Sequence, residues 1–122
     1  MALFILSEAF VNYKLKLEFI ILVNNYEILK RKILEMLEKA YQLSEDGNYT
    51  QALKHYQNIL RLEHDNIEAI IDYGVTLQNL ELYHEALEVY DKALTLQPKN
   101  ISALLLVLVV LHSKSVTESI HS

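Results

Sequence analysis

Cysteine is absent from this sequence of 122 residues, and so is tryptophan. Without cysteine the chain can form no disulfide, no thiolate nucleophile and no cysteine-ligated zinc site. This composition fits the cytoplasm, and we expect a cytoplasmic protein. Glycine and proline are also scarce, with two residues and one residue respectively. Because these residues dominate turns, their scarcity predicts a helical chain with short connections.

Positive charge is in short supply as well. Eleven Lys and Arg residues against sixteen Asp and Glu give a formal net charge of -5. This balance argues against nucleic acid as the main partner, because phosphate contacts require clustered basic side chains. The hydrophobic fraction of 52% argues against disorder, and the length is that of one ordinary domain.

The sequence lacks the motifs of common enzymes. None of its five histidines forms the i, i+4 pair with an intervening glutamate that marks a zinc hydrolase. It contains neither a glycine-rich phosphate loop nor a nucleophile elbow. We therefore expect a protein that is not an enzyme and that uses no metal or other cofactor.

The N-terminal extension, residues 1–25, has the weakest pattern. Charged side chains interrupt its apolar ones, so no run approaches the roughly 20 residues needed to cross a bilayer, and no secretory signal is evident. Residues 13–19 alternate apolar and charged side chains, which is a strand pattern. In an otherwise helical chain we favour a helix for part of this segment, packed as a cap, with an irregular extension as the alternative. Asn24 and Asn25 predict a break before the next helix.

From Ile33 to Asn100 one pattern of residues occurs twice, 34 positions apart. The matched pairs include Leu43 and Leu77, Tyr49 and Tyr83, Ala52 and Ala86, Leu53 and Leu87, Tyr56 and Tyr90, Leu60 and Leu94, and Asn66 and Asn100. A third copy begins at Ile101 and Ala103 and then departs from the pattern. A fixed period of this length is typical of a solenoid of stacked helical units.

Apolar spacing and turn residues predict five helices. They cover residues 26–45, 49–62, 67–79, 83–96 and 101–112, and a polar tail that frays follows over residues 113–122. Gly47 supplies the left-handed position that ends the first of these helices. Glu81 stands at the equivalent position of the second repeat, so that turn must either change shape or accept roughly 1–2 kcal/mol of strain. Asn48, and either Asp65 or Asn66, are the expected N-terminal caps.

Small and aromatic residues recur at fixed places within the repeat. They are Ala40, Ala52 and Tyr56 in the first copy, and Gly74, Ala86, Tyr90, Ala93 and Pro98 in the second. With its period of 34, this pattern resembles the tetratricopeptide repeat. The first copy departs at Ile59 and His64, and Leu108 is bulky where the third copy should carry a small residue. The resemblance assigns the small and aromatic residues to core packing rather than to a site.

The resemblance implies an all-α superhelix of antiparallel helix pairs. Its two and a half repeats would cover residues 33–66, 67–100 and 101–112 of a domain spanning residues 26–112. It also implies a non-catalytic scaffold or adaptor, in which the first helices of the repeats line a concave groove for a peptide or partner helix.

The groove positions that the resemblance assigns carry both apolar and acidic side chains. They are Leu34, Leu37, Glu38, Tyr41 and Glu45 from the first repeat, Glu68, Ile71, Asp72, Val75, Gln78 and Asn79 from the second, and Ser102, Leu105, Leu106, Val109 and His112 from the half repeat. Such a lining predicts an apolar or basic ligand segment. Taken singly, Glu38, Glu45 and Asp72 are more simply explained as solvated residues, whereas for the groove as a whole we favour binding.

One subtype of the family does not fit. Members that clamp the C-terminal carboxylate of Hsp70 and Hsp90 chaperones use Lys, Asn and Arg at set groove positions. Those positions here hold Leu37, Tyr41, Asp72, Ser102 and Leu106. Because Asp72 would repel a carboxylate, we expect a protein that is not of this chaperone-binding type.

Residues 104–111 are apolar on every face, which predicts a helix that requires cover. This run of eight residues is too short to span a membrane. We favour a homodimer through the helix at 101–112, with cover by the N-terminal segment and truncation of a longer array as alternatives. Two other functions stay open, namely a regulatory or substrate-docking domain of a larger enzyme, and a structural homo-oligomer whose groove holds a sister chain.

Overall fold

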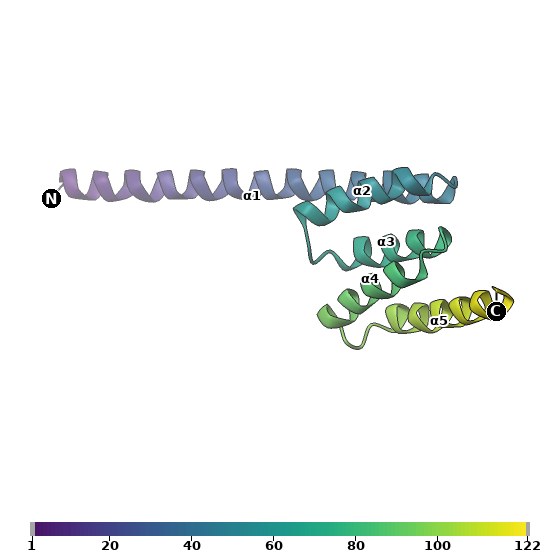
Figure 1. Cartoon of the computed structure of the whole chain (residues 1–122). Coiled ribbons are helices and arrows are strands. Elements are labelled where there is room, and N and C mark those ends of the chain that lie inside the picture. The colour runs from purple at the N-terminus through teal and green to yellow at the C-terminus, as the bar shows by residue number, and fades with distance from the viewer. Residues whose placement is uncertain (1, 122) are drawn as a thin grey trace. The chain divides into compact units, whose positions relative to one another are not determined.

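The computed structural model describes the backbone of residues 2–121 and the side chains of residues 7–120. Over this range it contains five helices and no strand (Figure 1). The helices are α1 (Ala2–Glu45), α2 (Tyr49–Leu62), α3 (Ile67–Asn79), α4 (Tyr83–Leu96) and α5 (Ile101–His121). The chain divides into two compact units, Met1–Leu34 and Glu35–Ser122, so that α1 contributes to both.

The N-terminal unit consists of the first part of α1. The helix runs without interruption through Asn24 and Asn25, so the predicted break at this point is wrong, and the alternating residues 13–19 are helical rather than extended. Asparagine disfavours a helix by only about 0.7 kcal/mol relative to alanine. Neither glycine nor proline occurs before Gly47, so no strong helix breaker stands earlier in the chain. The packing of residues 1–25 as a cap stays a prediction.

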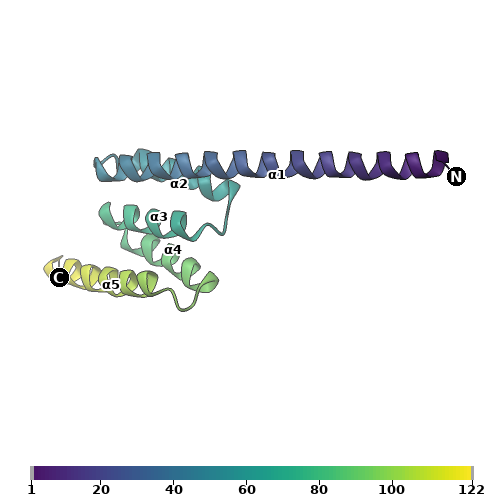
Figure 2. The same cartoon turned by 180° about the vertical axis from the view of Figure 1, so that it is seen from behind.

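The second unit is a row of antiparallel helices. Helix α2 packs on α3, α3 on α4 and α4 on α5, and Figures 1 and 2 show this order from opposite sides. Helix α4 lies in front of α3 in Figure 1 and behind it in Figure 2, so the two helices of the second repeat form separate layers. This arrangement confirms the all-α solenoid that the 34-residue period predicts.

A small residue lets the two helices of the second repeat approach closely. Gly74 on α3 faces the ring of Tyr90 on α4, and a Cβ atom at Gly74 would lie 2.8 Å from Cδ1 of that ring. The Tyr90 side chain is fully buried as a result. At the corresponding positions of the first repeat, Ala40 and Tyr56 are both fully buried too. The same pairing of a small residue with a tyrosine therefore organises both repeats.

Two apolar clusters join α3, α4 and α5 into one core. The first is formed by Leu77, Ala86, Tyr90 and Val110, and the second by Ile70, Ala93 and Ala103. Each cluster takes at least one residue from α3, α4 and α5. Burial of these side chains, at about 25 cal/mol per Å² of apolar surface, is the main force that holds successive repeats together.

Asparagine caps mark the start of each new repeat. The side-chain oxygen of Asn66 accepts a hydrogen bond from the backbone N–H of Ala69 at 3.0 Å. Asn100 repeats this contact with Ala103 at 2.9 Å. Asn48 stands at the N-cap of α2, but its side chain makes no capping bond, so that detail of the sequence prediction is wrong.

The turn inside each repeat keeps the same hydrogen bonds although its residues differ. The Asn48 N–H donates to the carbonyl of Leu43 at 2.8 Å, and the Leu82 N–H donates to that of Leu77 at 3.0 Å. Gly47 has φ 81° in the first turn, and Glu81 has φ 61° in the second. The second turn therefore keeps its shape and accepts the strain of a left-handed residue with a side chain.

Helix α5 is longer than the sequence predicts. The expected end lies near His112, with a fraying tail over residues 113–122, but the helix continues to His121. Polar residues alone do not end a helix, and the hydroxyl of Thr117 donates to the carbonyl of Ser113 at 2.9 Å within this part.

The added length makes α5 long enough to cross a membrane. Over Ile101–Ile120 the helix has a mean hydropathy of 1.6 and is long and apolar enough to cross a bilayer by length and composition alone. The prediction that the apolar segment is too short to span a membrane is therefore wrong for the complete helix. Core helices of soluble proteins that meet the same criterion are mostly buried, whereas only 11% of this stretch is. Helix α5 packs on α4 through a few residues, among them the fully buried Ala103 and Val110.

The strain at Glu81 gives a testable prediction. Glycine adopts a positive φ at no steric cost, so Glu81→Gly should raise the free energy of unfolding by about 1 kcal/mol. Urea denaturation followed by circular dichroism measures the change. Lys92→Gly is the matched control, because it places glycine inside α4 and should lower the free energy of unfolding by about 1 kcal/mol. Destabilisation by both substitutions would show that the turn is not strained.

Candidate functional site

The predicted groove residues lie on the last part of α1, on α3 and on α5, and most are accessible. Tyr41, Leu105 and Val109 expose 53%, 57% and 49% of their surface. Glu38, Glu45 and Asn79 are also exposed, and Ile71, Asp72 and Val75 are half-buried. We call the accessible members of the predicted groove set, Glu68 among them, the first-helix surface.

One predicted groove residue does not belong to this surface. Leu37 is only 6% exposed and lies in the core. Apolar spacing alone is compatible with Leu37 in the groove and with Leu37 in the core. The pattern shows which side chains share a helix face but not how much of that face is covered.

The most unusual residue of the first-helix surface is Asp72. Its burial raises the pKa of its carboxyl from 3.8 to about 6, and the nearby Glu68 carboxylate adds to the rise. Among the side chains that the structure describes, only His84 and Glu88 form an ion pair within 4.0 Å. Asp72 therefore has no cationic partner at that distance, and it is a half-buried carboxylate whose charge is uncompensated.

The charge of this carboxylate acts on two buried tyrosines from successive repeats. Burial raises the pKa of the Tyr56 and Tyr90 hydroxyls, and the negative charge of Asp72 raises both further. The Tyr90 hydroxyl donates a hydrogen bond to the side-chain oxygen of Gln78 at 3.1 Å. The rings of the two tyrosines thus pack in the core, while the negative charge of Asp72 acts on their hydroxyls.

A chain of hydroxyl groups ties α1 to α3 beside Asp72. The Thr76 hydroxyl donates to the backbone carbonyl of Asp72 at 2.8 Å. The Ser44 and Thr76 hydroxyl oxygens lie 3.2 Å apart. Because the Thr76 hydrogen is directed to Asp72, Ser44 is the donor in this second bond. These contacts fix the α3 backbone at the point where the acidic side chain emerges.

The part of this arrangement around Asp72 can attract a cation. Glu68 and Asp72 carry negative charge one helical turn apart, and Tyr41 is close enough to affect the pKa of Tyr56 as both carboxylates do. Ile71 and Val75 add half-buried apolar side chains on the same helix. A Lys or Arg side chain next to an apolar one would satisfy both features.

Four residues of this site carry a role that the sequence pattern does not predict. Ser44 and Thr76 were not singled out, and Tyr56 and Tyr90 were assigned to packing alone. Helical spacing could have given one signal, at Thr76. This hydroxyl residue is 1% exposed and lies on the face of α3 that packs against its neighbours, so it requires a hydrogen-bond partner there.

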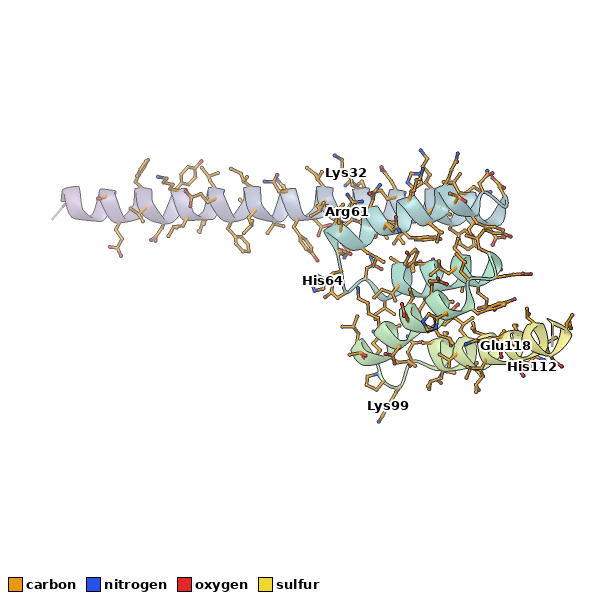
Figure 3. The ribbon with its side chains drawn as sticks, viewed as in Figure 1. Lys32, Arg61, His64, Lys99, His112 and Glu118 are labelled. Atoms are coloured by element: carbon orange, nitrogen blue, oxygen red, sulfur yellow. The ribbon has the colours of Figure 1, made fainter. Side chains whose placement is uncertain are left out.

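Histidines and acidic side chains form no metal site in the described part of the chain. No group of three or more metal-binding side chains occurs there. Figure 3 shows two of the histidines well separated, with His64 between α2 and α3 and His112 on α5.

The raised pKa of Asp72 predicts how stability depends on pH. Ionisation of Asp72 opposes folding, because the folded pKa of about 6 exceeds the ordinary value of 3.8. This penalty is absent below about pH 4, grows as pH rises, and is complete above about pH 6. Asp72→Asn should therefore raise the free energy of unfolding at pH 7 by roughly 1–2 kcal/mol, after allowance for partial exposure.

Denaturation of this variant at pH 7 and near pH 4 makes the comparison, and the gain should largely disappear at the lower pH. Asp91→Asn, on an exposed position of α4, is the control and should change little at either pH. An equal gain in the free energy of unfolding at both pH values would contradict the raised pKa of Asp72.

Known proteins match the repeat region of this chain. The photosystem I assembly protein Ycf3 of Synechococcus sp. (strain CC9311) is 41% identical over 66 residues, which are 48% of this chain and 36% of that protein. Ycf3 of Prochlorococcus marinus is 34% identical over 73 residues, covering 54% and 40%. The protein O-mannosyl-transferase Tmtc3 of Drosophila melanogaster is 36% identical over 59 residues, covering 48% and 6%. The chain thus spans well under half the length of these relatives.

Solved structures share the fold. The Yersinia enterocolitica type III secretion translocator chaperone SycD, in an alternative dimer, superposes with a TM-score of 0.66 at 19% identity, covering 68% of this chain and 63% of SycD. A double mutant of MamA RS-1 gives 0.64 at 27% identity, covering 67% and 46%. The tetratricopeptide domain of Arabidopsis OM64 gives 0.60 at 22% identity, covering 64% of each chain.

The sequence profile of the tetratricopeptide repeat matches residues 43–105, which is just over half of the chain. This match covers α2, α3, α4 and the start of α5, where the period of 34 and the pairing of Gly74 with Tyr90 are found. The chain belongs to the tetratricopeptide repeat family.

Proposed function

We propose that this protein is a non-catalytic scaffold or adaptor that binds a basic and partly apolar protein segment on its first-helix surface. The tetratricopeptide fold is one that binds protein or peptide partners. The observation that carries the proposal is the uncompensated, half-buried carboxylate of Asp72 beside Glu68.

A ligand cation would change the ionisation of Asp72. At pH 7 most Asp72 side chains are ionised, because the pKa of about 6 lies below that pH. Their charge is held where burial disfavours it, so a Lys or Arg side chain from a partner would stabilise the ionised form and lower the pKa. Glu68 is exposed and would add attraction at longer range.

Apolar neighbours of Asp72 favour a ligand that is also partly apolar. Ile71 and Val75 are half-buried and keep part of their surface in water, while Leu105 on α5 is 57% exposed. Covering such side chains contributes about 25 cal/mol per Å². An amphipathic helix or extended peptide with basic residues beside apolar ones would use both contributions. A ligand that ends in a free carboxylate at Asp72 is disfavoured, so a chaperone carboxylate-clamp function is not proposed.

The relatives support an assembly role in general terms. Two of them are named as photosystem I assembly proteins, and the match lies in the repeat region. The mannosyl-transferase relative supports the rival function, a docking domain of a larger enzyme, but the match covers only 6% of that protein. The cysteine-free composition supports a cytoplasmic location.

Self-association is a second proposed property. Helix α5 also exposes large apolar side chains outside the first-helix surface, among them Leu104 and Leu108 at 44% and 63%. Such a surface needs cover, and a homodimer through residues 101–112 would supply it.

A pair of designed helical peptides tests the proposed binding. Both have roughly 14 residues, about four turns, with one leucine face, and the flanking positions are lysine in one peptide and glutamate in the other. Fluorescence anisotropy should detect binding of the lysine peptide to the protein and no binding of the glutamate peptide. Asp72→Asn should weaken its binding about fivefold, which corresponds to about 1 kcal/mol.

Asp65→Asn removes one negative charge from the exposed connection between α2 and α3, outside the first-helix surface, and is the matched control for net charge. It should leave the affinity for the lysine peptide within about twofold. Equal effects of the two substitutions would show that only overall charge matters. Preference for the glutamate peptide would contradict the proposal directly.

A further inference from the structure

The stacking of the repeats identifies an uncovered position for one more helix. Helix α4 is covered on one side by α2 and α3, whose Leu53, Leu60 and Tyr73 pack against the clusters that contain Ala86, Tyr90 and Ala93. Leu53, Leu60 and Tyr73 therefore form the surface on which the second helix of the following repeat packs.

The same surface recurs 34 residues later without a helix on it. The equivalents of Leu53, Leu60 and Tyr73 are Leu87, Leu94 and Val107. They line a hollow of about 400 Å³ on α4 and α5, together with Leu111 and the acidic Glu88 and Asp91. We call this surface the α4/α5 seat. Because the preceding seat is filled by a helix, a helix is the shape that this one fits.

A segment of this chain carries the side-chain pattern of the helices that fill such seats. Residues 8–19 place an acid or amide, a small residue, large apolar residues and a tyrosine in the order found in α4 and α2. Glu8, Ala9, Phe10, Tyr13, Leu17 and Phe19 match Glu85, Ala86, Leu87, Tyr90, Leu94 and Leu96, and they match Gln51, Ala52, Leu53, Tyr56, Leu60 and Leu62. The segment lies within helix α1, so it has the required conformation.

This segment is uncovered, as a docking element must be. Phe10, Tyr13 and Phe19 expose 67%, 61% and 66% of their surface. Lys14 carries positive charge, whereas the seat carries Glu88 and Asp91. Apolar pattern and charge are therefore both complementary between the segment and the seat. Lys16 stands at the position of Ala93 and Ile59, which are fully buried in their own helices, so it is the residue at which the segment departs from the pattern.

We propose that residues 8–19 of a second copy of the chain occupy the α4/α5 seat. A second copy is favoured over the same copy because residues 20–32 are helical, and docking within one chain would require that helix to break. A reciprocal exchange gives a two-fold dimer, and a one-way exchange gives a growing chain of copies.

The seat departs from its predecessor at one position. Leu108 replaces Gly74, the residue against which the Tyr90 ring lies. Tyr13 is the equivalent of Tyr90, so Tyr13 of the docked segment is placed next to Leu108. Leu108 is 63% exposed, so its side chain would have to turn aside for the Tyr13 ring to approach α5 as Tyr90 approaches α3.

Cysteine cross-linking of the full chain tests this contact, since the natural sequence has no cysteine that could interfere. Tyr13→Cys and Leu108→Cys chains are prepared separately, mixed, and treated with a short bismaleimide. The mixture should give a product of twice the chain mass, roughly tenfold more than a mixture of Leu15→Cys and Leu108→Cys. Leu15 is a matched control because it is 57% exposed and lies on a different face of the helix.

Each other outcome contradicts the proposal. A dimer from Leu108→Cys alone would show that α5 packs on α5. Cross-linking of a Tyr13→Cys, Leu108→Cys double variant at the mass of one chain would show that the segment docks within its own copy. Equal yields with Tyr13→Cys and Leu15→Cys would show that the segment has no fixed register.

Light scattering of a second variant keeps the test independent of the introduced thiols. Leu108→Ala restores the small residue of the earlier seat, so it should strengthen self-association, by roughly fivefold in the dissociation constant. Weaker association of Leu108→Ala would indicate that Leu108 is itself an apolar anchor of a different interface, and a monomeric wild-type chain would overturn the proposal.

Discussion

The close approach of α3 and α4 at Gly74 is the contact on which the remainder of the repeat domain depends. Without a side chain at Gly74, the ring of Tyr90 lies against the α3 backbone and is fully buried. The ring then joins Leu77, Ala86 and Val110 in the core, which fixes α5 on α4. Its hydroxyl reaches Gln78 and lies in the field of Asp72. The absence of a side chain at Gly74 thus positions both the core and the polar side of the candidate site.

The repeat region could be predicted from the sequence because its signals are local and doubled. The period of 34 located α2, α3 and α4, since each helix is bounded by turn residues or caps that occur twice. The ends of α1 and α5 were harder, because they lack a second copy for comparison. Asn24, Asn25 and the polar residues after His112 weaken a helix without stopping it, so both helices run further than expected.

The site was only partly predictable for a different reason. Position in the repeat predicts which residues face the groove, Asp72 among them, but it gives no measure of burial. Leu37 and Asp72 occupy groove positions alike, yet one is core and the other is a half-buried carboxylate with a raised pKa. That pKa depends on Glu68 and on the packing around α3, and such a combination appears only when the helices are assembled.

The measurement that most directly tests the role of the Gly74 contact is a double-mutant cycle in urea. Gly74→Leu should lower the free energy of unfolding by roughly 1–3 kcal/mol, because the new side chain overlaps the Tyr90 ring. In a Tyr90→Ala background, the same substitution should cost nothing or stabilise, since the ring is gone and leucine favours a helix. An equal loss in both backgrounds would show that the two helices are not held together by this contact.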